Sequence, residues 1–362
     1  MILSIISLTN YTPVFYNAVL VLFLLAVFQL FVKGYVIKDF KKKEYVSFSL
    51  FIAVTLYMGL RPISGRYFVD MAMYNYDFEQ YASGTKIVEG SDFLWNIFMK
   101  TCSGIMTAKM FFLFCAVLYL TPLYIAAKKW LGEDRYFLFL MLVASFSFWA
   151  YGTNGIRNGI ATSLFVLAIS MNGKKYIKYG VLAISYGVHG SMLIPVAAYT
   201  LTLFYKNTKY YLLGWLLCIP LSLAFGGAFE SIVLSLGIGG DRIGYLTMGG
   251  FEDQFSSTGF RWDFLIYSAV AVFVGYYFII KRKFDDKLYI QLFNIYVTAN
   301  AFWILMIMAT FSNMFAYLSW FLMAIIILYP FFKQKFLKQQ QKVLGYSVLF
   351  YFAFTYFMLT IL

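Results

Sequence analysis

The feature that most constrains this chain is a series of apolar segments, each about long enough to cross a bilayer, separated by polar loops. A helix needs about 20 apolar residues to span the hydrocarbon core, and short spans have about 17. Hydrophobic residues make up 62% of the 362 residues and charged residues only 12%, about half the charge of a soluble domain. The sequence therefore predicts an all-α, polytopic integral membrane protein. It excludes a soluble globular enzyme, a disordered regulator and a disulfide-stapled secreted domain.

Twelve segments are predicted to be transmembrane helices. They lie at 14–33, 45–60, 109–127, 136–152, 156–172, 177–188, 191–205, 210–226, 262–280, 288–310, 313–332 and 343–361. The short pair 177–188 and 191–205 meets around His189 and is alternatively one long kinked helix or a re-entrant pair. No soluble domain boundary is visible, so residues 1–362 are predicted to form a single membrane domain.

The basic residues predict the orientation. One set of alternate loops holds 21 of the 29 Lys and Arg residues, and the positive-inside rule makes that side cytoplasmic. Both termini then face out, as do the two long loops at 61–108 and 227–261. The first apolar run lacks a positive segment before it, so it is predicted to be a retained helix and not a cleaved signal peptide. Most of the net charge of +13 thus determines topology, and no nucleic-acid partner is expected.

Arginine is concentrated on the outer face. Five of the eight outer basic residues are Arg, against two of the 21 inner ones. A guanidinium binds phosphate oxygens with two donors at once, so the cluster predicts an anionic, lipid-linked ligand such as a pyrophosphate. The alternative is that these arginines pair with the ten outer carboxylates. The five are Arg61, Arg66, Arg157, Arg242 and Arg261.

Two residues stand at predicted outer helix ends. Arg157 lies in YGTNGIRNGIATSLF, where three glycines allow close backbone approach and a helix N-terminus favours an anion; the alternative is interfacial snorkelling. His189, the only histidine, lies in SYGVHGSMLIP. Neutral imidazole is a suitable general base near pH 7, whereas many lone histidines are only hydrogen-bonded structural residues.

The segment LRPISGRYFVDMAMYNYDFEQY follows the second predicted span. Asp70, Tyr74 and Phe78 fall on one face of a helix. Asp70 is predicted to position a sugar hydroxyl or act as a base, and Tyr74 to stack on a sugar ring. The alternative is an amphipathic interfacial helix with belt tyrosines. The pairs Asp241–Arg242 and Arg261–Asp263 bracket the second long loop, as internal salt bridges or as acceptor contacts.

Motifs for metal and cofactor chemistry are not found in the sequence. One His and three scattered Cys give no zinc site, and no P-loop, GxSxG or HExxH pattern occurs. The adjacent outer pair Glu252–Asp253 is a weak metal candidate and is more typical of a solvated loop tip. We expect no metal and no cofactor.

The chain resembles the EpsG-like and Wzy-type polysaccharide polymerases. The matching features are SGRYFVDMAMYNYDF, FWAYGTNGIRNGIATSLFVLAI, the basic turn NGKKYIKY and LAISYGVHGSMLIPVAAY. Arg157 and His189 match the family's motif positions directly, and Arg61, Arg66 and Asp70 match more loosely. In FSNMFAYLSWF, Asn313 matches a family segment, but Met314 stands where the family pattern has Arg. Either this member uses other arginines for pyrophosphate or its activity is reduced.

The resemblance implies a GT-C-like, all-helical glycosyltransferase of the bacterial inner membrane, of the kind that builds O-antigen, lipopolysaccharide or capsule. It would join undecaprenyl-pyrophosphate-linked oligosaccharides, as donor and acceptor, on the periplasmic face, with membrane lipid and a chain-length regulator protein as further partners. Rival readings are a lipid-linked oligosaccharide flippase, an O-antigen ligase-like transferase and a membrane acyltransferase. Ionisable residues gathered at outer helix ends, and not at mid-span, favour outer-face chemistry over transport.

Overall fold

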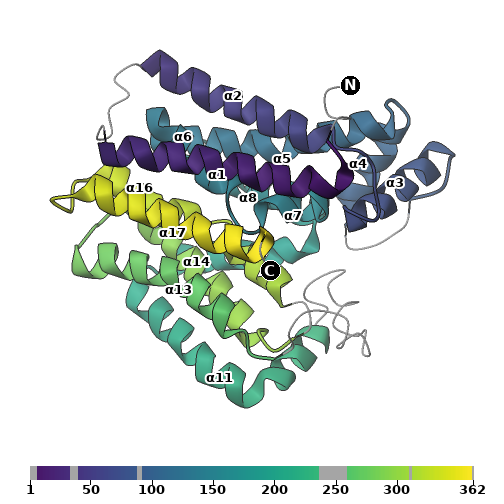
Figure 1. Cartoon of the computed structure of the whole chain (residues 1–362). Coiled ribbons are helices and arrows are strands. Elements are labelled where there is room, and N and C mark those ends of the chain that lie inside the picture. Colours follow the sequence, from purple (N-terminus) through teal and green to yellow (C-terminus); the bar gives the residue numbers. More distant parts are fainter. Residues whose placement is uncertain (1–5, 33–39, 88–91, 236–258, 310–311, 361–362) are drawn as a thin grey trace. The chain divides into compact units, whose positions relative to one another are not determined.

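The described part of the chain is almost entirely helical. The computed structural model describes residues 6–32, 40–87, 92–235, 259–309 and 312–360, which contain no β-strand (Figure 1). Seven helices in these ranges are long and apolar enough to cross a membrane. They are Leu8–Phe31, Ala108–Val143, Thr208–Phe229, Trp262–Lys281, Lys287–Leu305, Asn313–Lys333 and Gln340–Thr360. The prediction of a polytopic helical membrane protein is therefore confirmed.

Each of the twelve predicted segments contains helix, but several are shorter or more broken than expected. Segment 136–152 is split into α6 (Arg135–Val143) and α7 (Phe148–Thr153), and segment 313–332 into α15 (Asn313–Trp320) and α16 (Met323–Lys333). Three further apolar helices are shorter than a full span: Glu44–Gly59, Ile156–Ile169 and Gly190–Phe204. The count of twelve crossings and the GT-C-like arrangement remain predictions.

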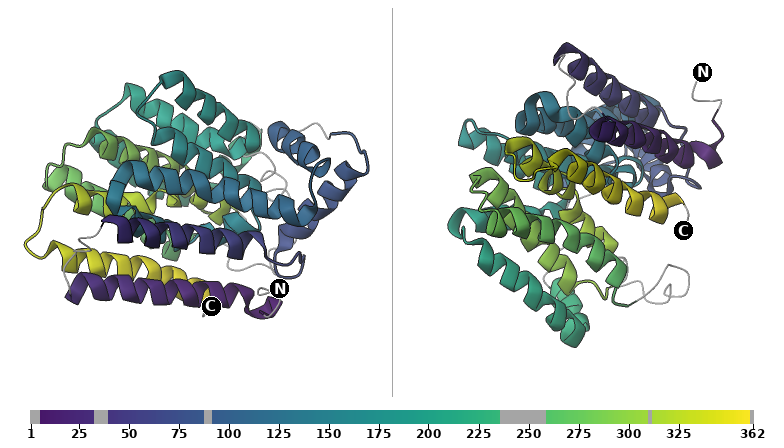
Figure 2. Two further views of the ribbon diagram at one scale, coloured as in Figure 1. Left: turned by 90° about the horizontal axis from the view of Figure 1, so that it is seen from above. Right: turned by 60° about the vertical axis from the view of Figure 1, so that its left-hand side comes forward.

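The helices group into two compact units. The first consists of Met1–His189 with Gln334–Leu362, and the second of Gly190–Lys333. In the first unit, α1 (Leu8–Val32) runs alongside α17 (Gln340–Thr360), as Figures 1 and 2 show. The ring of Phe23 on α1 stacks on Phe352 of α17 at 4.5 Å between centroids. This packing joins the two ends of the chain within one unit.

The core of the first unit surrounds α5 (Ala108–Leu131). This helix packs against α2 (Phe40–Gly59), α6 and α8 (Ile156–Ile169), and α8 packs in turn against α9 (Lys175–Val188). The short helix α7 precedes α8 and doubles back on it. A Cβ at Gly159 would collide with the backbone carbonyl of Tyr151, and one at Gly152 with the side chain of Met58. These two glycines therefore allow the close approach that brings the start of α8 into the core.

Two short helices lie together at one end of the first unit (Figure 1). They are α3 (Val69–Ala82) and α4 (Phe93–Ser103), and both fall in the predicted first outer loop, 61–108. Phe78 of α3 packs on Phe111 of α5 at 4.9 Å, and Tyr74 meets Trp95 of α4 edge to face at 5.6 Å. The loop is thus an ordered layer packed on the helices beneath it.

The second unit is organised around α14 (Lys287–Leu305), which packs against α10 (Leu193–Phe204), α11 (Thr208–Ser235) and α15. Buried polar side chains connect these helices: the indole of Trp215 donates to Asn300 at 2.7 Å, and Asn300 donates to Ser319 at 3.0 Å. Helix α13 (Trp262–Tyr276) packs against α16 and α14. Residues 227–235 of the predicted second loop are helical, and 236–258 lie outside the described residues.

Candidate active site

The α3–α4 layer presents one face to the start of α8. Tyr74 and Phe78 are buried on this face of α3, as their spacing of four residues predicts. Asp70, one turn before Tyr74, is partly exposed. Burial raises the pKa of the Asp70 carboxyl above its usual value, and the charge of Arg157 offsets part of that rise. The same two influences, in the same order, act on the pKa of Asp77. Two carboxyl groups of α3 therefore lie within the electrostatic reach of Arg157.

Arg157 is the second residue of α8 and is directed at this layer. Its Nη1 donates to Oδ2 of Asp92 at 2.9 Å, and its Nε donates to the hydroxyl of Tyr74 at 3.3 Å. The guanidinium also lies over the Tyr74 ring at 5.6 Å from the centroid. The side chain keeps 18% of its surface exposed. The guanidinium is thus held by an aromatic ring and a carboxylate in a side chain that is only partly buried.

Asp92 connects Arg157 to His189. Its carboxylate is only 3% exposed, with Oδ2 on Arg157 and Oδ1 at 3.6 Å from Nδ1 of His189. Asp92 immediately precedes α4, Arg157 lies in the first turn of α8, and His189 follows α9. Three chain segments that are far apart in the sequence therefore converge on one carboxylate. Sequence reasoning counted Asp92 only among the ten outer carboxylates and missed it as a site residue, because nothing local distinguishes it from the other nine.

His189 marks the end of α9. Its backbone is extended, with φ −151° and ψ 121°, and the 3₁₀ turn Gly190–Met192 follows. The imidazole is buried, with a residue exposure of 2%. A Cβ at Gly187 would meet the side chain of Leu94, so this glycine lets the end of α9 approach the start of α4. The structure has two helices here, Lys175–Val188 and Leu193–Phe204, separated at His189; their crossing of the membrane stays a prediction.

Arg61 is buried beside the site and has a structural role. It is 4% exposed, and its guanidinium donates to the carbonyls of Met58 at 2.6 Å and Thr153 at 3.0 Å. Burial lowers its pKa to about 10, so the group stays charged at neutral pH. Thr153 is the last residue of α7, four residues before Arg157. Arg61 therefore fixes the turn that carries Arg157. Arg66 is exposed and lies over the ring of Tyr67 at 5.6 Å.

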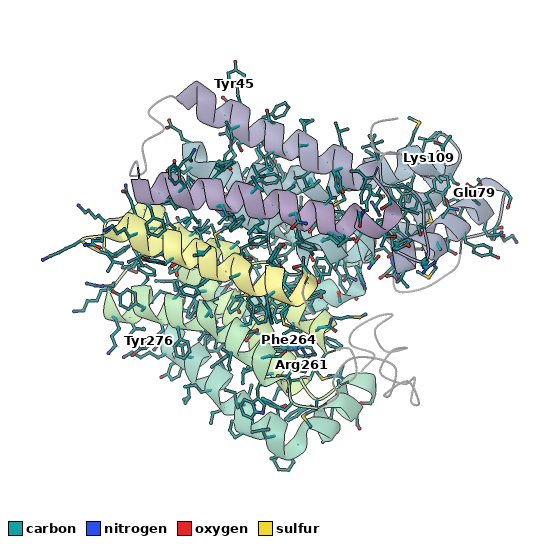
Figure 3. The ribbon with its side chains drawn as sticks, in the orientation of Figure 1. Tyr45, Glu79, Lys109, Arg261, Phe264 and Tyr276 are labelled. Atoms are coloured by element: carbon teal, nitrogen blue, oxygen red, sulfur yellow. The ribbon has the colours of Figure 1, made fainter. Side chains whose placement is uncertain are left out.

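The other predicted ligand-binding residues belong to the second unit. Arg261 donates two hydrogen bonds to the carboxylate of Asp263, at 2.9 and 2.6 Å. Its guanidinium lies over the ring of Phe264, 3.9 Å from the centroid (Figure 3). Of the two predicted alternatives for this pair, the structure has the salt bridge. Asn313 is the first residue of α15 and is partly exposed. Arg242 and the Glu252–Asp253 pair lie outside the described residues. The ligand-binding roles of these residues remain predictions.

Chemically, the group of Tyr74, Asp92, Arg157 and His189 combines two functions. Arg157 supplies a delocalised cation suited to phosphate oxygens, and His189 supplies a group that exchanges a proton near neutral pH. Burial raises the pKa of the Tyr74 hydroxyl to about 12, so it stays protonated beside Arg157. In the described ranges, no group of three or more His, Cys, Asp or Glu side chains is arranged to hold a metal ion.

Comparison with known proteins adds one match. The model of the EpsG family matches residues 60–362, which cover every residue of the group just described. No curated protein and no solved structure matches the chain.

Proposed function

Because the chain belongs to the EpsG family, we propose that it is a polysaccharide polymerase, a glycosyltransferase that joins undecaprenyl-pyrophosphate-linked oligosaccharide repeat units on the outer face of the bacterial inner membrane. Family membership supports EpsG-type polysaccharide biosynthesis at a membrane. The observation that carries the finer proposal is that one buried carboxylate, Asp92, contacts both Arg157 and His189. A phosphate-binding cation and a proton acceptor are thereby held together.

The proposed reaction transfers a glycan between two lipid-linked molecules. A hydroxyl oxygen of the acceptor sugar attacks the anomeric carbon of the donor glycan, and the bond from that carbon to the pyrophosphate oxygen breaks. The bonding electrons leave with the lipid pyrophosphate, and the hydroxyl proton passes to a base of the enzyme. Arg157 stabilises the charge that grows on the leaving group, which is the main electrostatic demand of the step.

Two residues are candidates for the base. His189 is buried beside Asp92, and burial raises the pKa of the Asp70 carboxyl above its usual value. An imidazole and a carboxyl with a raised pKa are both suitable proton acceptors. Tyr74 is buried and lies against the guanidinium of Arg157, so its proposed role is to hold Arg157 in place. Arg61 supports this arrangement through Thr153, and Arg66, Arg242, Arg261 and Asn313 are proposed as additional ligand contacts.

The test is polymerisation by purified full-length protein supplied with lipid-linked repeat units. We expect Arg157→Ala to slow chain growth by about 100-fold or more, because a preorganised cation at the leaving group is lost. His189→Ala should slow it by a factor on the order of 100 to 10,000, the usual contribution of a general base. If both variants extend chains at the wild-type rate, the assigned roles are wrong.

A matched control is Arg282→Ala. Arg282 is an exposed arginine that donates to the hydroxyl of Tyr277, in a loop predicted to be cytoplasmic, so its loss should leave chain growth unchanged. The same preparation distinguishes the rival functions. Movement of labelled lipid-linked repeat across reconstituted vesicles without chain growth would indicate a flippase. Transfer of finished glycan to a different acceptor, again without chain growth, would indicate a ligase.

A further inference from the structure

Asp92 stands at the start of α4 but does not cap it. An aspartate in this position normally accepts a hydrogen bond from a backbone N–H in the first turn of the helix. Here the backbone carbonyl of Asp92 accepts from the N–H of Asn96 at 3.1 Å, but the side chain makes no capping hydrogen bond. The carboxylate is directed instead at Arg157 and His189. The position of Asp92 is therefore explained by its partners on α8 and α9 and not by its own helix.

A carboxylate this deeply buried is destabilising unless charged or hydrogen-bonding groups compensate it. Arg157 supplies one such group at 2.9 Å. The second contact runs from Oδ1 to Nδ1 of His189 at 3.6 Å, which is ion-pair distance and slightly longer than a hydrogen bond. With Arg157 on Oδ2, the other carboxylate oxygen is the one turned toward the imidazole. This arrangement favours the imidazole form that has its proton on Nδ1.

We propose that Asp92 is a positioning residue for His189: it accepts the Nδ1 proton, fixes the ring and makes Nε2 the basic nitrogen of the site. The catalytic consequence rests on the proposed polymerase function, whereas the pairing itself rests on geometry. Because the same carboxylate holds Arg157, Asp92 also fixes the base relative to the cation that receives the pyrophosphate. The inference assigns proton transfer to His189 and leaves Asp70 to orient a sugar hydroxyl.

The charges around His189 come from several elements. Asp92 precedes α4 and Arg157 lies in the first turn of α8, and both helices pack against α9. Asp70 and Asp77 of α3 act on Arg157. The ammonium groups on these helices lie farther along: Lys175 and Lys178 are at the opposite end of α9, and Lys100 in the last turn of α4 donates to the carbonyl of Thr85. Asp92 is thus a carboxylate in direct contact with His189.

The sequence offers a direct probe of this pairing. Because His189 is the only histidine in the chain, tag-free full-length protein labelled with ¹⁵N,¹³C-histidine gives one imidazole spin system in detergent micelles. We expect the neutral ring to carry its proton on Nδ1. In Asp92→Asn, the titration midpoint of the ring should fall by about one pH unit, because the imidazolium loses a buried anionic neighbour. A wild-type ring protonated on Nε2 overturns the inference without any variant.

The matched control is Asp77→Asn. It also replaces a carboxyl near Arg157, but on α3 and without contact to His189, so the imidazole midpoint should stay at the wild-type value. Polymerisation provides the functional readout. Asp92→Asn should lower kcat about tenfold or more, and the acidic limb of its pH–rate profile should move to lower pH together with the imidazole midpoint. A purely structural loss would lower the rate without moving that limb.

The outcomes separate the inference from the proposed function. If the spectra are as expected but His189→Ala protein polymerises at the wild-type rate, the pairing stands and the catalytic role of His189 fails. If His189→Ala is inactive but Asp92→Asn changes neither the imidazole midpoint nor the pH–rate profile, the polymerase assignment stands and the role of Asp92 is wrong.

Discussion

At the scale of single residues, two arginines of the first unit are held in different ways. Arg61 donates to two backbone carbonyls and lies 5.5 and 5.6 Å from the rings of Phe68 and Phe112. Arg157 pairs with a carboxylate and a phenol hydroxyl. A phosphate can replace a carboxylate on a guanidinium, because each presents two oxygens that accept hydrogen bonds from the planar guanidinium. It cannot replace backbone carbonyls without opening the fold. The proposed pyrophosphate therefore fits Arg157 better than Arg61, whose contacts support the α7–α8 turn.

Asp70 gives a prediction at the same scale. Its pKa is raised mainly by burial, so folding favours the protonated form. The stabilising contribution of the protonated carboxyl is complete below the pKa of the unfolded chain and is lost as the pH rises through the folded-state pKa. We therefore expect Asp70→Asn to unfold at a higher temperature than wild type at pH 7, with the difference disappearing near pH 4.

Thermal unfolding of purified protein in detergent, followed at both pH values, measures this difference. Glu79→Gln on the same helix is the control, because Glu79 is exposed and its neutralisation should change little at either pH. An Asp70→Asn protein that is less stable than wild type at pH 7 would show that its ionised form is stabilised by Arg157 and not penalised by burial.

At the scale of helices, the α7–α8 turn decides where Arg157 lies. The turn closes with hydrogen bonds from the N–H groups of Asn154 and Gly155 to the carbonyl of Ala150, both at 2.9 Å. Gly159 then packs against the backbone of Tyr151 one helix earlier. Backbone contacts between α7 and α8 thus set the position of Arg157, whose side chain contacts Tyr74 of α3 and Asp92 before α4. A substitution at Gly159 should therefore displace Arg157, although Gly159 is not itself one of the site residues.

Gly159→Ala tests this expectation. The added Cβ would collide with the backbone carbonyl of Tyr151, which cannot rotate away. Helices α7 and α8 must therefore move apart, and this movement displaces Arg157. We expect a lower unfolding temperature and at least a tenfold loss of chain growth, since misplacement by about 1 Å already costs about 100-fold in many enzymes.

Gly180→Ala is the matched control for that change. Gly180 lies within α9, where an added Cβ meets nothing within 4 Å. Alanine is favoured over glycine in a helix by about 0.8–1 kcal/mol, so this variant should be as active as wild type and at least as stable. Equal behaviour of the two alanine variants would show that close α7–α8 packing does not determine the site.

At the scale of the whole molecule, charge and hydropathy divide the chain into two faces. The seven apolar helices explain why so few charges occur along the spans. The predicted topology places 21 basic residues on one side and eight on the other, and it assigns the layer of α3 and α4 to the side with fewer lysines. The predicted orientation therefore puts Tyr74 and Asp92 outside, together with the chain termini.

Cysteine labelling in intact cells tests the orientation. In a background with Cys102, Cys115 and Cys218 replaced by alanine, Glu79→Cys on α3 (Figure 3) should react with a membrane-impermeant maleimide added outside. Lys174→Cys, which is exposed in the basic turn before α9, should react only after permeabilisation. The opposite pattern would invert the topology and move the site to the cytoplasm.

The sequence by itself determined the class of this protein and part of its site. Apolar runs predicted the helices, because each must satisfy its own backbone hydrogen bonds in lipid, and the EpsG-like resemblance was confirmed by the family match. The face of α3 that carries Tyr74 followed from its spacing. Arg157 and His189 stood out because charge and imidazole are rare in such a chain.

Only the tertiary structure decided which of these residues meet. Arg157 and His189 converge on Asp92 because α4, α8 and α9 pack at one end of the first unit, through contacts between residues up to about a hundred positions apart. Local spacing cannot encode such an encounter, and nothing local distinguishes Asp92 from the other outer carboxylates. Likewise, Arg61 resembled the other outer arginines until its burial and its backbone partners distinguished it. Long-range packing, which hydropathy does not specify, assembles this site.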